Sequence, residues 1–427
     1  MHWTHRCAVP TVERVTELRP SPTPWAGHAA GSTGYRRIVV ALFAAGVATF
    51  AQLYSVQAVL PAMAGDLGVD PSRAALGVSV ATGALAVSVV GWSALADRVG
   101  RVPAMVASVL AATVLGLAVP VAPGLAGLLL LRALQGAALG GLPAVAMAYL
   151  AEEVRAGQVA RAAAAYVAGT SIGGLSGRIV SSSVADLTSW RWGVAAVAVL
   201  GVAATTVFCV LVPRSRGFAG RRRAPGEARL AARLSAALAD PGLLVLYGQA
   251  LLMMGAFVTV YNYLGFRLLA APFSLSQTVV GLLFVTYLAG TASSALAGRL
   301  AERSSRLRVL LGSGAVFAAG CLLTLSASLP VVVAGLVLLT AGFFAAHATA
   351  SGWTGARAQP GVRAQASALY TFGYYLGSSV LGWLGGAFYG AGGWGAVVAF
   401  VTGLAALAVL LAGLVLRRAR PTGSMAA

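Results

Sequence analysis

Two arginines stand inside apolar stretches of this sequence, where a charged side chain needs water or a partner. Arg132 follows the leucine run 128–131, and Arg178 follows a glycine-rich run. A guanidinium deep in a membrane costs about 3 kcal/mol or more, so it marks a substrate or ion pathway unless protein groups bind it. We therefore expect Arg132, with Gln135 and Gly136 beside it, to face a cavity and to couple a proton or bind an anionic group. The alternative is a structural arginine that bonds backbone carbonyls or Gln135.

Arg178 and His347 are further candidates for cavity or coupling residues. Arg178 either faces the cavity, bonds polar groups across helices, or extends toward the membrane surface. His347 is the one histidine beyond residue 28. An imidazole titrates near neutral pH and can carry a proton, but a core histidine bonded to a neighbouring hydroxyl fits the sequence equally well.

Several uncharged polar side chains also lie in apolar stretches. Such groups need hydrogen-bond partners, which either a bound solute and water or the neighbouring helices supply. The candidates for direct substrate contact are Tyr54, Gln57, Asn262 and Tyr370, with Tyr374 and Tyr375 close by in sequence.

The acidic residues limit the chemistry. None of the eleven lies in the middle of an apolar stretch, so an exporter that trades protons for multivalent cations on a buried carboxylate is disfavoured. Neutral or weakly anionic solutes, such as sugars, metabolites or amphipathic antibiotics, fit better. No nucleophile–base or metal-ligand group can be assembled, and a phosphate loop needs a lysine, which this chain lacks. We expect no enzyme activity, no cofactor and no metal.

The composition indicates that membrane-spanning segments hold these candidate residues. Of 427 residues, 59% are hydrophobic and 10% are charged, whereas soluble domains carry about 25% charged residues. A membrane span needs about 20 apolar residues, and the sequence offers twelve such stretches. They lie near 38–61, 75–96, 103–121, 124–149, 160–184, 193–212, 242–268, 277–298, 308–327, 330–353, 364–388 and 393–416.

The basic residues predict the orientation. The net charge of +19 is the difference between 30 arginines and 11 acidic residues. The arginines lie in short clusters between spans rather than on one face, so nucleic-acid binding is disfavoured. With the N-terminus inside, 25 of them fall on the cytoplasmic side and only Arg73, Arg191 and Arg267 fall outside. Because cytoplasmic loops are enriched in basic residues, we expect a multi-pass protein of the plasma or inner membrane with both termini cytoplasmic.

Five segments follow from this pattern. We expect a flexible cytoplasmic tail at 1–35, a six-helix bundle at 36–213, and a basic cytoplasmic linker at 214–240. A second six-helix bundle occupies 241–417, and a cytoplasmic tail occupies 418–427. Nothing in this arrangement needs a second chain, so we expect a monomer.

The two bundles repeat each other. Tyr166, Gly169 and Gly173 recur as Tyr370, Gly373 and Gly377, each 204 residues later. Parallel repeats of this kind flank a central substrate site in transporters and rock against each other. The small residues Gly169, Gly173, Gly174 and Gly177 have the spacing that lets two helices approach closely.

A charged loop also recurs at the cytoplasmic side. Its first copy holds Asp97, Arg98, Gly100 and Arg101, and its second copy holds Gly298, Glu302, Arg303 and Arg306. Charge-assisted hydrogen bonds from such a loop to another helix can hold one conformation and break in the other. We expect gating at both loops, with the second as the weaker latch. The alternative is a solvated turn.

These motifs resemble those of the major facilitator superfamily. The first loop is similar to its Gly-x-Leu-Ala-Asp-Arg-x-Gly-Arg-Arg signature, with Ser93 for the first glycine and Val102 for the last arginine. Arg132-Ala-Leu-Gln135-Gly136 resembles its Arg-x-x-Gln-Gly motif, and the segment 169–178 resembles its antiporter motif with Gly174 where proline is usual. The segments 173–178, 261–267 and 342–347 look like the YnfM-like branch, grouped with arabinose- and drug-efflux permeases.

The resemblance implies an all-α membrane fold of two six-helix bundles related by a pseudo-two-fold axis. It also implies secondary-active transport by rocker-switch alternating access, as a proton-coupled exporter of small organic solutes. The alternative is a proton-independent facilitator of a neutral or anionic solute. The expected partners are a small-molecule substrate, protons and the lipid bilayer, without nucleic acid.

Overall fold

The computed structural model describes residues 25–218 and 230–417, and it is built from helices. The N-terminal half contains α1 (Thr33–Leu53), α2 (Leu60–Leu67), α3 (Pro71–Val99), α4 (Arg101–Ala118), α5 (Gly124–Leu139), α6 (Gly141–Glu153), α7 (Val159–Leu187) and α8 (Trp190–Leu211). The C-terminal half contains α9 (Leu230–Leu238), α10 (Pro241–Leu269), α11 (Gln277–Leu282), α12 (Tyr287–Arg303), α13 (Arg306–Leu323), α14 (Leu329–Arg357) and α15 (Arg363–Leu411).

The predicted all-α membrane fold is confirmed. Ten helical segments of the described chain are long and apolar enough to span a membrane. One of them, Pro360–Leu416, contains two spans, because Gly392 and Gly393 leave helical geometry and kink α15. With α7, which is long but carries many glycines and serines, the described helices supply the twelve predicted spans. α1 with α2, α5 with α6, and α11 with α12 each form one interrupted span.

Capping residues mark where several helices begin. Asp70 accepts a hydrogen bond from the Arg73 amide at 2.9 Å, directly before α3. Asp240 accepts one from the Gly242 amide at 2.7 Å, directly before α10. In both helices a proline follows the cap. Such an acidic cap and a proline in the first turn satisfy the free end of a helix, so these starts are encoded locally.

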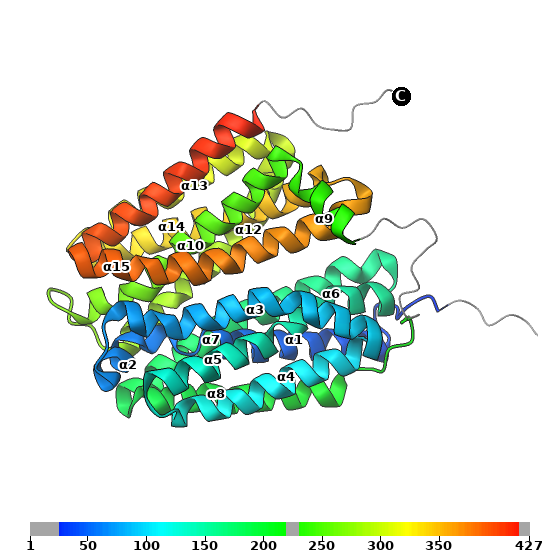
Figure 1. Ribbon diagram of the computed structural model, residues 1–427, viewed down its shortest axis with the longest axis horizontal. Helices are drawn as coiled ribbons and strands as arrows, with labels where there is room; N and C mark the ends of the chain where they lie inside the picture. Colours follow the sequence, from blue (N-terminus) through cyan, green and yellow to red (C-terminus); the bar gives the residue numbers. More distant parts are fainter. Residues whose placement is uncertain (1–24, 219–229, 418–427) are drawn as a thin grey trace, which may run out of the picture.

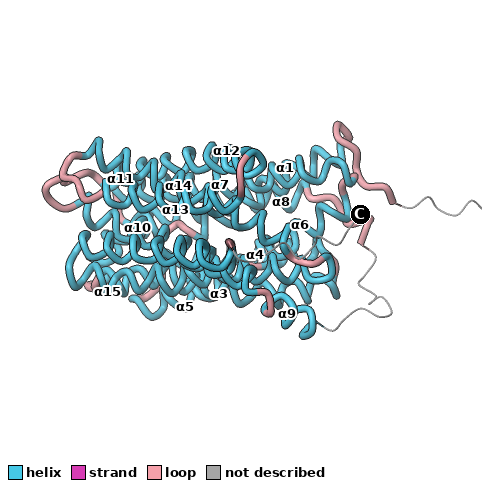
Figure 2. The backbone as a smooth tube through the Cα atoms, turned by 90° about the horizontal axis from the view of Figure 1, so that it is seen from above, coloured by secondary structure: helices cyan, strands magenta, loops and turns pink. Residues whose placement is uncertain are grey.

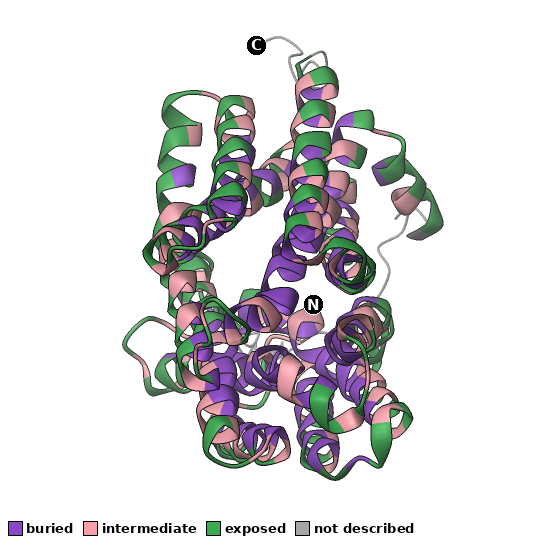
Figure 3. Cartoon of the chain, turned by 90° about the vertical axis from the view of Figure 1, so that its left-hand side faces the viewer, coloured by how far each residue is buried: buried purple, intermediate pink, exposed green. Residues whose placement is uncertain are grey.

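The two halves lie side by side, with α1–α8 in one and α10–α15 in the other (Figure 1). Large apolar side chains are exposed on both halves, for example Val87, Leu130, Val199, Leu288 and Leu414. Exposed residues line the periphery of the molecule, and buried residues gather inside each half and between them (Figure 3). A lipid bilayer would cover such an apolar periphery.

Glycines bring the same helices together in each half. A Cβ atom at Gly169 of α7 would lie 2.2 Å from the Phe43 carbonyl oxygen of α1, and one at Gly173 would lie 2.6 Å from Val47 Cα. In the second half, a Cβ at Gly377 of α15 would lie 2.0 Å from the carbonyl oxygen of Leu251 in α10. Leu251 is the residue 204 positions after Val47. The repeat therefore extends to the backbone contacts that its glycines make.

The halves touch at one end of the molecule and diverge at the other. We call the end with Asp186 and Gln277 the outer end and the end with Asp97 and Asp240 the inner end, after the orientation predicted from the arginines. At the outer end, the Thr278 hydroxyl donates to Asp186 at 2.7 Å and joins α11 to α7. At the inner end, α6 and α9 lie on diverging bundles (Figure 1). The view from above also places α11 at the end opposite α6 and α9 (Figure 2).

Part of the predicted N-terminal tail packs on the first half. The His28 amide donates to the Glu153 carbonyl at 2.8 Å, and the His28 carbonyl accepts from the Arg155 amide at 3.2 Å. Residues 25–32 thus differ from the flexible tail expected for 1–35, because backbone pairing with the end of α6 holds them. Residues 1–24 and 418–427 of the predicted tails, and 219–229 of the predicted linker, lie outside the described residues.

Candidate functional site

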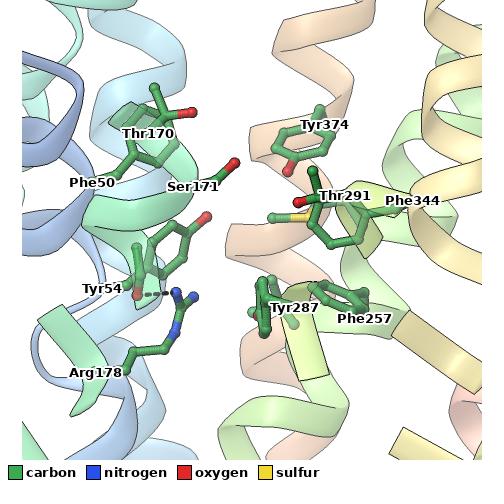
Figure 4. A pocket seen from close by; sticks show the side chains of 13 residues that line it. Phe50, Tyr54, Thr170, Ser171, Arg178, Phe257, Tyr287, Thr291, Phe344 and Tyr374 are labelled. Atoms are coloured by element: carbon green, nitrogen blue, oxygen red, sulfur yellow. Dashed lines mark hydrogen bonds between the residues drawn. The ribbon is translucent and has the colours of Figure 1, made fainter. Parts of the chain in front are cut away.

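A central cavity lies between the two halves and consists of two joined chambers. The deep chamber, of about 110 Å³, lies toward the outer end, and the mouth, of about 380 Å³, lies toward the inner end. The two chambers share six lining residues from both halves: Phe50, Thr170, Ser171, Thr291, Phe344 and Tyr374. In the deep chamber, Tyr54 and Arg178 face Phe257 and Tyr287 of the other half (Figure 4). Both halves therefore build the site jointly.

A chain of hydrogen bonds closes the outer side of the deep chamber. Arg178 donates through Nε to Gln57 Oε1 at 2.8 Å, and Gln57 donates through Nε2 to Asn262 Oδ1 at 2.8 Å. Asn262 in turn donates to the Gly382 carbonyl at 3.3 Å. Gln57 and Asn262 are buried. The structure places these two predicted substrate contacts in the closure between the halves rather than among the lining residues.

Other polar contacts at the outer end join the halves as well. The Gln277 amide donates to Asp186 Oδ1 at 3.2 Å, and the Gln277 side chain donates to the Ala58 carbonyl. The Ser379 hydroxyl donates to the Ser79 carbonyl at 2.8 Å, between α15 and α3. The outer end is thus sealed by hydrogen bonds, while the mouth opens toward the inner end.

Arg178 is buried and surrounded by aromatic rings. Its guanidinium carbon lies 4.2 Å from the ring centroid of Tyr54, and 4.9 Å from those of Phe284 and Tyr287. Its Nη1 donates to the Gly174 carbonyl at 2.6 Å. Of the three interpretations from sequence, the structure supports the first two together: Arg178 lines the deep chamber and also bonds across helices. The cation–π contacts stabilise its charge in a chamber whose described lining holds no carboxylate.

His347 and Tyr370 lie together at the mouth. The Tyr370 hydroxyl lies 3.0 Å from His347 Nδ1, and it also donates to the His347 carbonyl at 3.2 Å. The imidazole ring lies 4.8 Å from the Tyr374 ring, centroid to centroid. His347 therefore bonds a neighbouring hydroxyl, as one interpretation from sequence held, and it also lines the mouth. A role in carrying protons stays a prediction.

Arg132 is placed differently from the cavity position expected. It is fully buried in the N-terminal half and lines neither chamber. Nε donates to the Gly77 carbonyl at 2.9 Å, Nη1 donates to the Gln52 carbonyl at 3.0 Å, and Nη2 donates to the Leu53 carbonyl. Gln52 and Leu53 are the last two residues of α1. The guanidinium thus caps an interrupted helix, which is the structural alternative stated above.

Gln135 and Gly136 belong to the same structural arrangement. Gln135 accepts from Arg132 Nη1 at 2.5 Å and donates to the side chain of Gln52 at 3.2 Å. A Cβ atom at Gly136 would lie 2.1 Å from the Ala81 carbonyl oxygen, so this glycine lets α5 lie directly on α3. These residues hold the N-terminal half together.

The first charged loop braces the inner end of the N-terminal half. Arg101 donates to Asp97 at 2.6 Å and to Glu152 of α6 at 2.8 Å. Gly100 has φ of +97°, which favours glycine, and it joins α3 to α4. These two ion pairs join α3, α4 and α6 of one half. The neighbouring Arg98 is exposed.

The second charged loop, between α12 and α13, is solvent-facing. Gly298, Glu302, Arg303 and Arg306 are all exposed. A different ion pair stands at this end of the C-terminal half: Arg357 of α14 donates to Asp240 at 2.9 Å. Sequence reasoning missed this pair, because its members lie 117 positions apart and neither belongs to the repeated loop.

Most lining residues were not identified from sequence. The hydroxyl side chains Thr170, Ser171 and Thr291 and the rings Phe257, Tyr287 and Phe344 line the cavity. Hydroxyl and aromatic residues are common in membrane-spanning helices, so their spacing in the sequence does not distinguish cavity-lining residues from residues that pack between helices. The lining residues that sequence reasoning had singled out are Tyr54, Gly174, Arg178, His347, Tyr370, Tyr374 and Tyr375. Within the described residues no group of three His, Cys, Asp or Glu side chains stands ready for a metal ion.

Comparison with known proteins gives consistent results along the chain. The family model of the Major Facilitator Superfamily matches residues 42–278 and 264–426. The inner membrane transport protein YnfM of Escherichia coli K12 is 41% identical over 381 residues, which cover 89% of this chain and 91% of that protein. The uncharacterized MFS-type transporter YybF of Bacillus subtilis 168 is 38% identical over 387 residues, covering 91% of this chain and 95% of that protein.

Solved structures agree in fold. A bacterial homologue of the human lysosomal transporter Spinster, in an inward-facing and occupied conformation, matches with a TM-score of 0.74 at 16% identity. The match covers 91% of this chain and 98% of that chain. A mutant form of the nucleoside transporter NupG also matches with a TM-score of 0.74, at 13% identity, covering 88% of this chain and 99% of that chain.

Proposed function

Because this chain belongs to the major facilitator superfamily, whose members move solutes by alternating access, we propose that it is a proton-coupled exporter of small organic solutes. The observation that carries the proposal is the central cavity. It is lined by both halves, sealed at the outer end through Gln57 and Asn262, and open toward the inner end. A solute would enter from the cytoplasm, and rocking of the halves would then expose it outside.

The lining favours a compact organic solute over a bare ion. Aromatic rings from both halves line it, and the hydroxyls of Thr170, Ser171 and Thr291 can form hydrogen bonds with a solute. Pockets of this composition bind organic molecules through apolar contact and a few polar groups that fix orientation. The export direction is supported by the resemblance of segments 173–178, 261–267 and 342–347 to efflux permeases.

Proton coupling is supported by His347. It lines the mouth, and its Nδ1 lies within hydrogen-bond distance of the Tyr370 hydroxyl. An imidazole can exchange a proton with the cytoplasm from such a position. A proton-independent facilitator is the second candidate, and one observation favours it: no carboxylate is found among the described residues that line either chamber.

Other properties belong to the same proposal. The arginine distribution supports a plasma or inner membrane location with both termini in the cytoplasm. A monomer suffices, since the lining of the cavity comes from one chain. The charged loops at Asp97–Arg101 and Glu302–Arg306 would pair with other helices when the inner end closes.

The experiment uses protein in liposomes loaded with a pH-sensitive dye. Sugars, sugar acids and amphipathic antibiotics are added singly to a preset proton gradient, with wild type, His347→Gln, and His28→Gln as a matched histidine control outside the cavity. We expect a solute-dependent proton flux that falls in His347→Gln and persists in His28→Gln. Exchange of a labelled solute without proton movement would refute the proton-coupled exporter and favour the proton-independent facilitator. Absence of movement of every solute would refute the proposal.

A further inference from the structure

The described lining of the central cavity carries one fixed positive charge and no negative charge. Among the described residues that line its two chambers, Arg178 is the only arginine, and neither Asp nor Glu is present. Arg178 is 3% exposed. A cation in such an apolar, desolvated place attracts an anion far more strongly than a surface arginine does, because little water screens it.

The guanidinium is oriented so that its edge remains available. Aromatic rings lie around it at 4.2 to 4.9 Å, and Nε and Nη1 donate to Gln57 and the Gly174 carbonyl. Within the described chain, Nη2 has no hydrogen-bond partner. A guanidinium carries five N–H donors in one plane and binds a carboxylate through two parallel bonds. The free part of the Arg178 fork thus suits an acidic group that enters the deep chamber.

Gly174 makes room for this position. A Cβ atom there would lie 3.1 Å from Arg178 Nη1, so any larger residue would press on the guanidinium. This is the position at which the sequence departs from the proline that is usual in the resembling motif. Glycine here supplies both space and an accessible carbonyl for Arg178.

The opposite wall suits a ring or another flat apolar body. Phe257, Tyr287 and Phe344 of the C-terminal half face the chamber across from Arg178 and Tyr54 (Figure 4). The rings of Phe257 and Phe344 lie 5.8 Å apart, edge to face, and that of Tyr287 lies 5.9 Å from Phe344. These rings contact one another and form a continuous apolar wall, and a flat apolar group that packs against it loses contact with water.

We infer that the solute is an organic monoanion whose acidic group binds Arg178 and whose ring packs against Phe257, Tyr287 and Phe344. This inference rests on the proposed function, and it narrows the neutral or weakly anionic solutes to ring-bearing acids. Arg178 is then a specificity residue that selects the charge of the solute.

The test compares three probes that share a ring and differ in charge: benzoate, benzamide and benzylamine. Binding of radiolabelled benzoate to purified protein in detergent is measured directly, and the other two probes are tested as competitors. The variants are Arg178→Gln and Arg178→Lys. Size-exclusion profiles and unfolding midpoints show whether each variant folds.

A second pair of variants keeps the test valid if Arg178 is needed for folding. Ser171 is exposed in the cavity and lies seven residues before Arg178 on α7, which is about 10 Å along the helix axis. Ser171→Asp brings a negative charge to the chamber, and Ser171→Asn is its neutral control of equal size. At an effective dielectric constant of about 20, two charges at that separation change an affinity roughly 10-fold.

We expect saturable benzoate binding to wild type, with benzamide and benzylamine at least about 10-fold weaker. Arg178→Gln should weaken benzoate binding by about 10- to 100-fold, the usual effect of losing a charged hydrogen-bond partner. Arg178→Lys should retain part of the affinity, and Ser171→Asp should bind benzoate about 10-fold more weakly than Ser171→Asn, which differs from it only in charge.

Contrary results separate the inference from the proposed function. The inference is overturned if benzamide or benzylamine binds wild type as tightly as benzoate, if benzoate does not bind folded wild type, or if folded Arg178→Gln keeps full benzoate affinity. If the liposomes then still show transport of a neutral or cationic solute, the proposed function stands alone. If no solute, whether anionic, neutral or cationic, binds to the protein or crosses the membrane, the proposed function fails too.

Discussion

Replacing Arg132 by methionine distinguishes a structural arginine from a coupling arginine. In the structure its guanidinium donates to the carbonyls of Gly77, Gln52 and Leu53 and to the side chain of Gln135. Methionine fills a similar volume but donates nothing. Three buried carbonyls then lose a charged donor, and hydrogen bonds to charged groups contribute roughly 1.5–3 kcal/mol each when taken singly.

The expected loss of stability is about 3–5 kcal/mol. This loss is smaller than the sum of the single hydrogen-bond contributions, because the contributions of neighbouring bonds are not additive and the carbonyls find other donors in part. For a cooperative unit the size of one half, this corresponds to a fall in the unfolding midpoint of about 10 °C. The assay is the fraction of detergent-solubilised protein that remains monodisperse after heating to successive temperatures.

Arg191→Met is the matched control. Arg191 also donates to two backbone carbonyls, those of Pro120 and Ala122, but its side chain is 34% exposed at the outer end. Solvent can replace those bonds, so we expect a loss of at most about 1 kcal/mol. If Arg132→Met unfolds no earlier than Arg191→Met and yet abolishes proton flux in liposomes, the structural assignment is refuted and a coupling role is restored.

Three further changes test the cavity and the packing. Gln57→Ala removes the hydrogen bond to Asn262 that joins the halves at the outer end. A reporter cysteine at Ser182, which lies against Gly281 in the outer seal, should then react faster with a membrane-impermeant maleimide than the same cysteine does with Gln57 intact. An equal reaction rate would contradict a sealing role for Gln57. Gly174→Ala should press on Arg178 Nη1 and weaken solute binding about 10-fold with little change in the unfolding midpoint, as measured on the same samples; unchanged binding would show that the guanidinium adapts. Gly169→Ala places a Cβ 2.2 Å from the Phe43 carbonyl oxygen and should destabilise the protein by about 1–3 kcal/mol in the same thermal assay. Its control is Gly403→Ala, whose Cβ meets nothing within 4 Å. That control should leave the stability unchanged or raise it slightly.

The charged loop at the inner end is where the sequence predicts a gate between the halves. Arg101 pairs with Asp97 and Glu152 inside one half, and the halves are apart at that end (Figure 1). Neither ion pair of Arg101 reaches the other half, so neither tests the expected gate. The role expected for Asp97, Arg98, Gly100 and Arg101 therefore stays a prediction.

The architecture can be predicted from the amino-acid sequence alone. The number of spans follows from the lengths of apolar stretches, because a helix must cross a fixed thickness of hydrocarbon. The duplication follows from residues that recur at a constant separation, and the structure extends it to the backbone contacts of Gly173 and Gly377. The number of spans and the duplication depend only on the order of residues along the chain, so they can be found without knowing how the helices pack.

The composition of the site, in contrast, depends on how the helices pack. Arg132 and Arg178 lie in similar apolar surroundings in sequence, but α5 turns Arg132 toward the interrupted end of α1, whereas α7 turns Arg178 into the chamber between the halves. Likewise Gln57 and Asn262 are ordinary polar residues until the halves meet and join them. The direction in which a helix presents a side chain depends on which neighbours pack around it. Helical periodicity alone cannot tell a face that meets another helix from a face that meets a cavity.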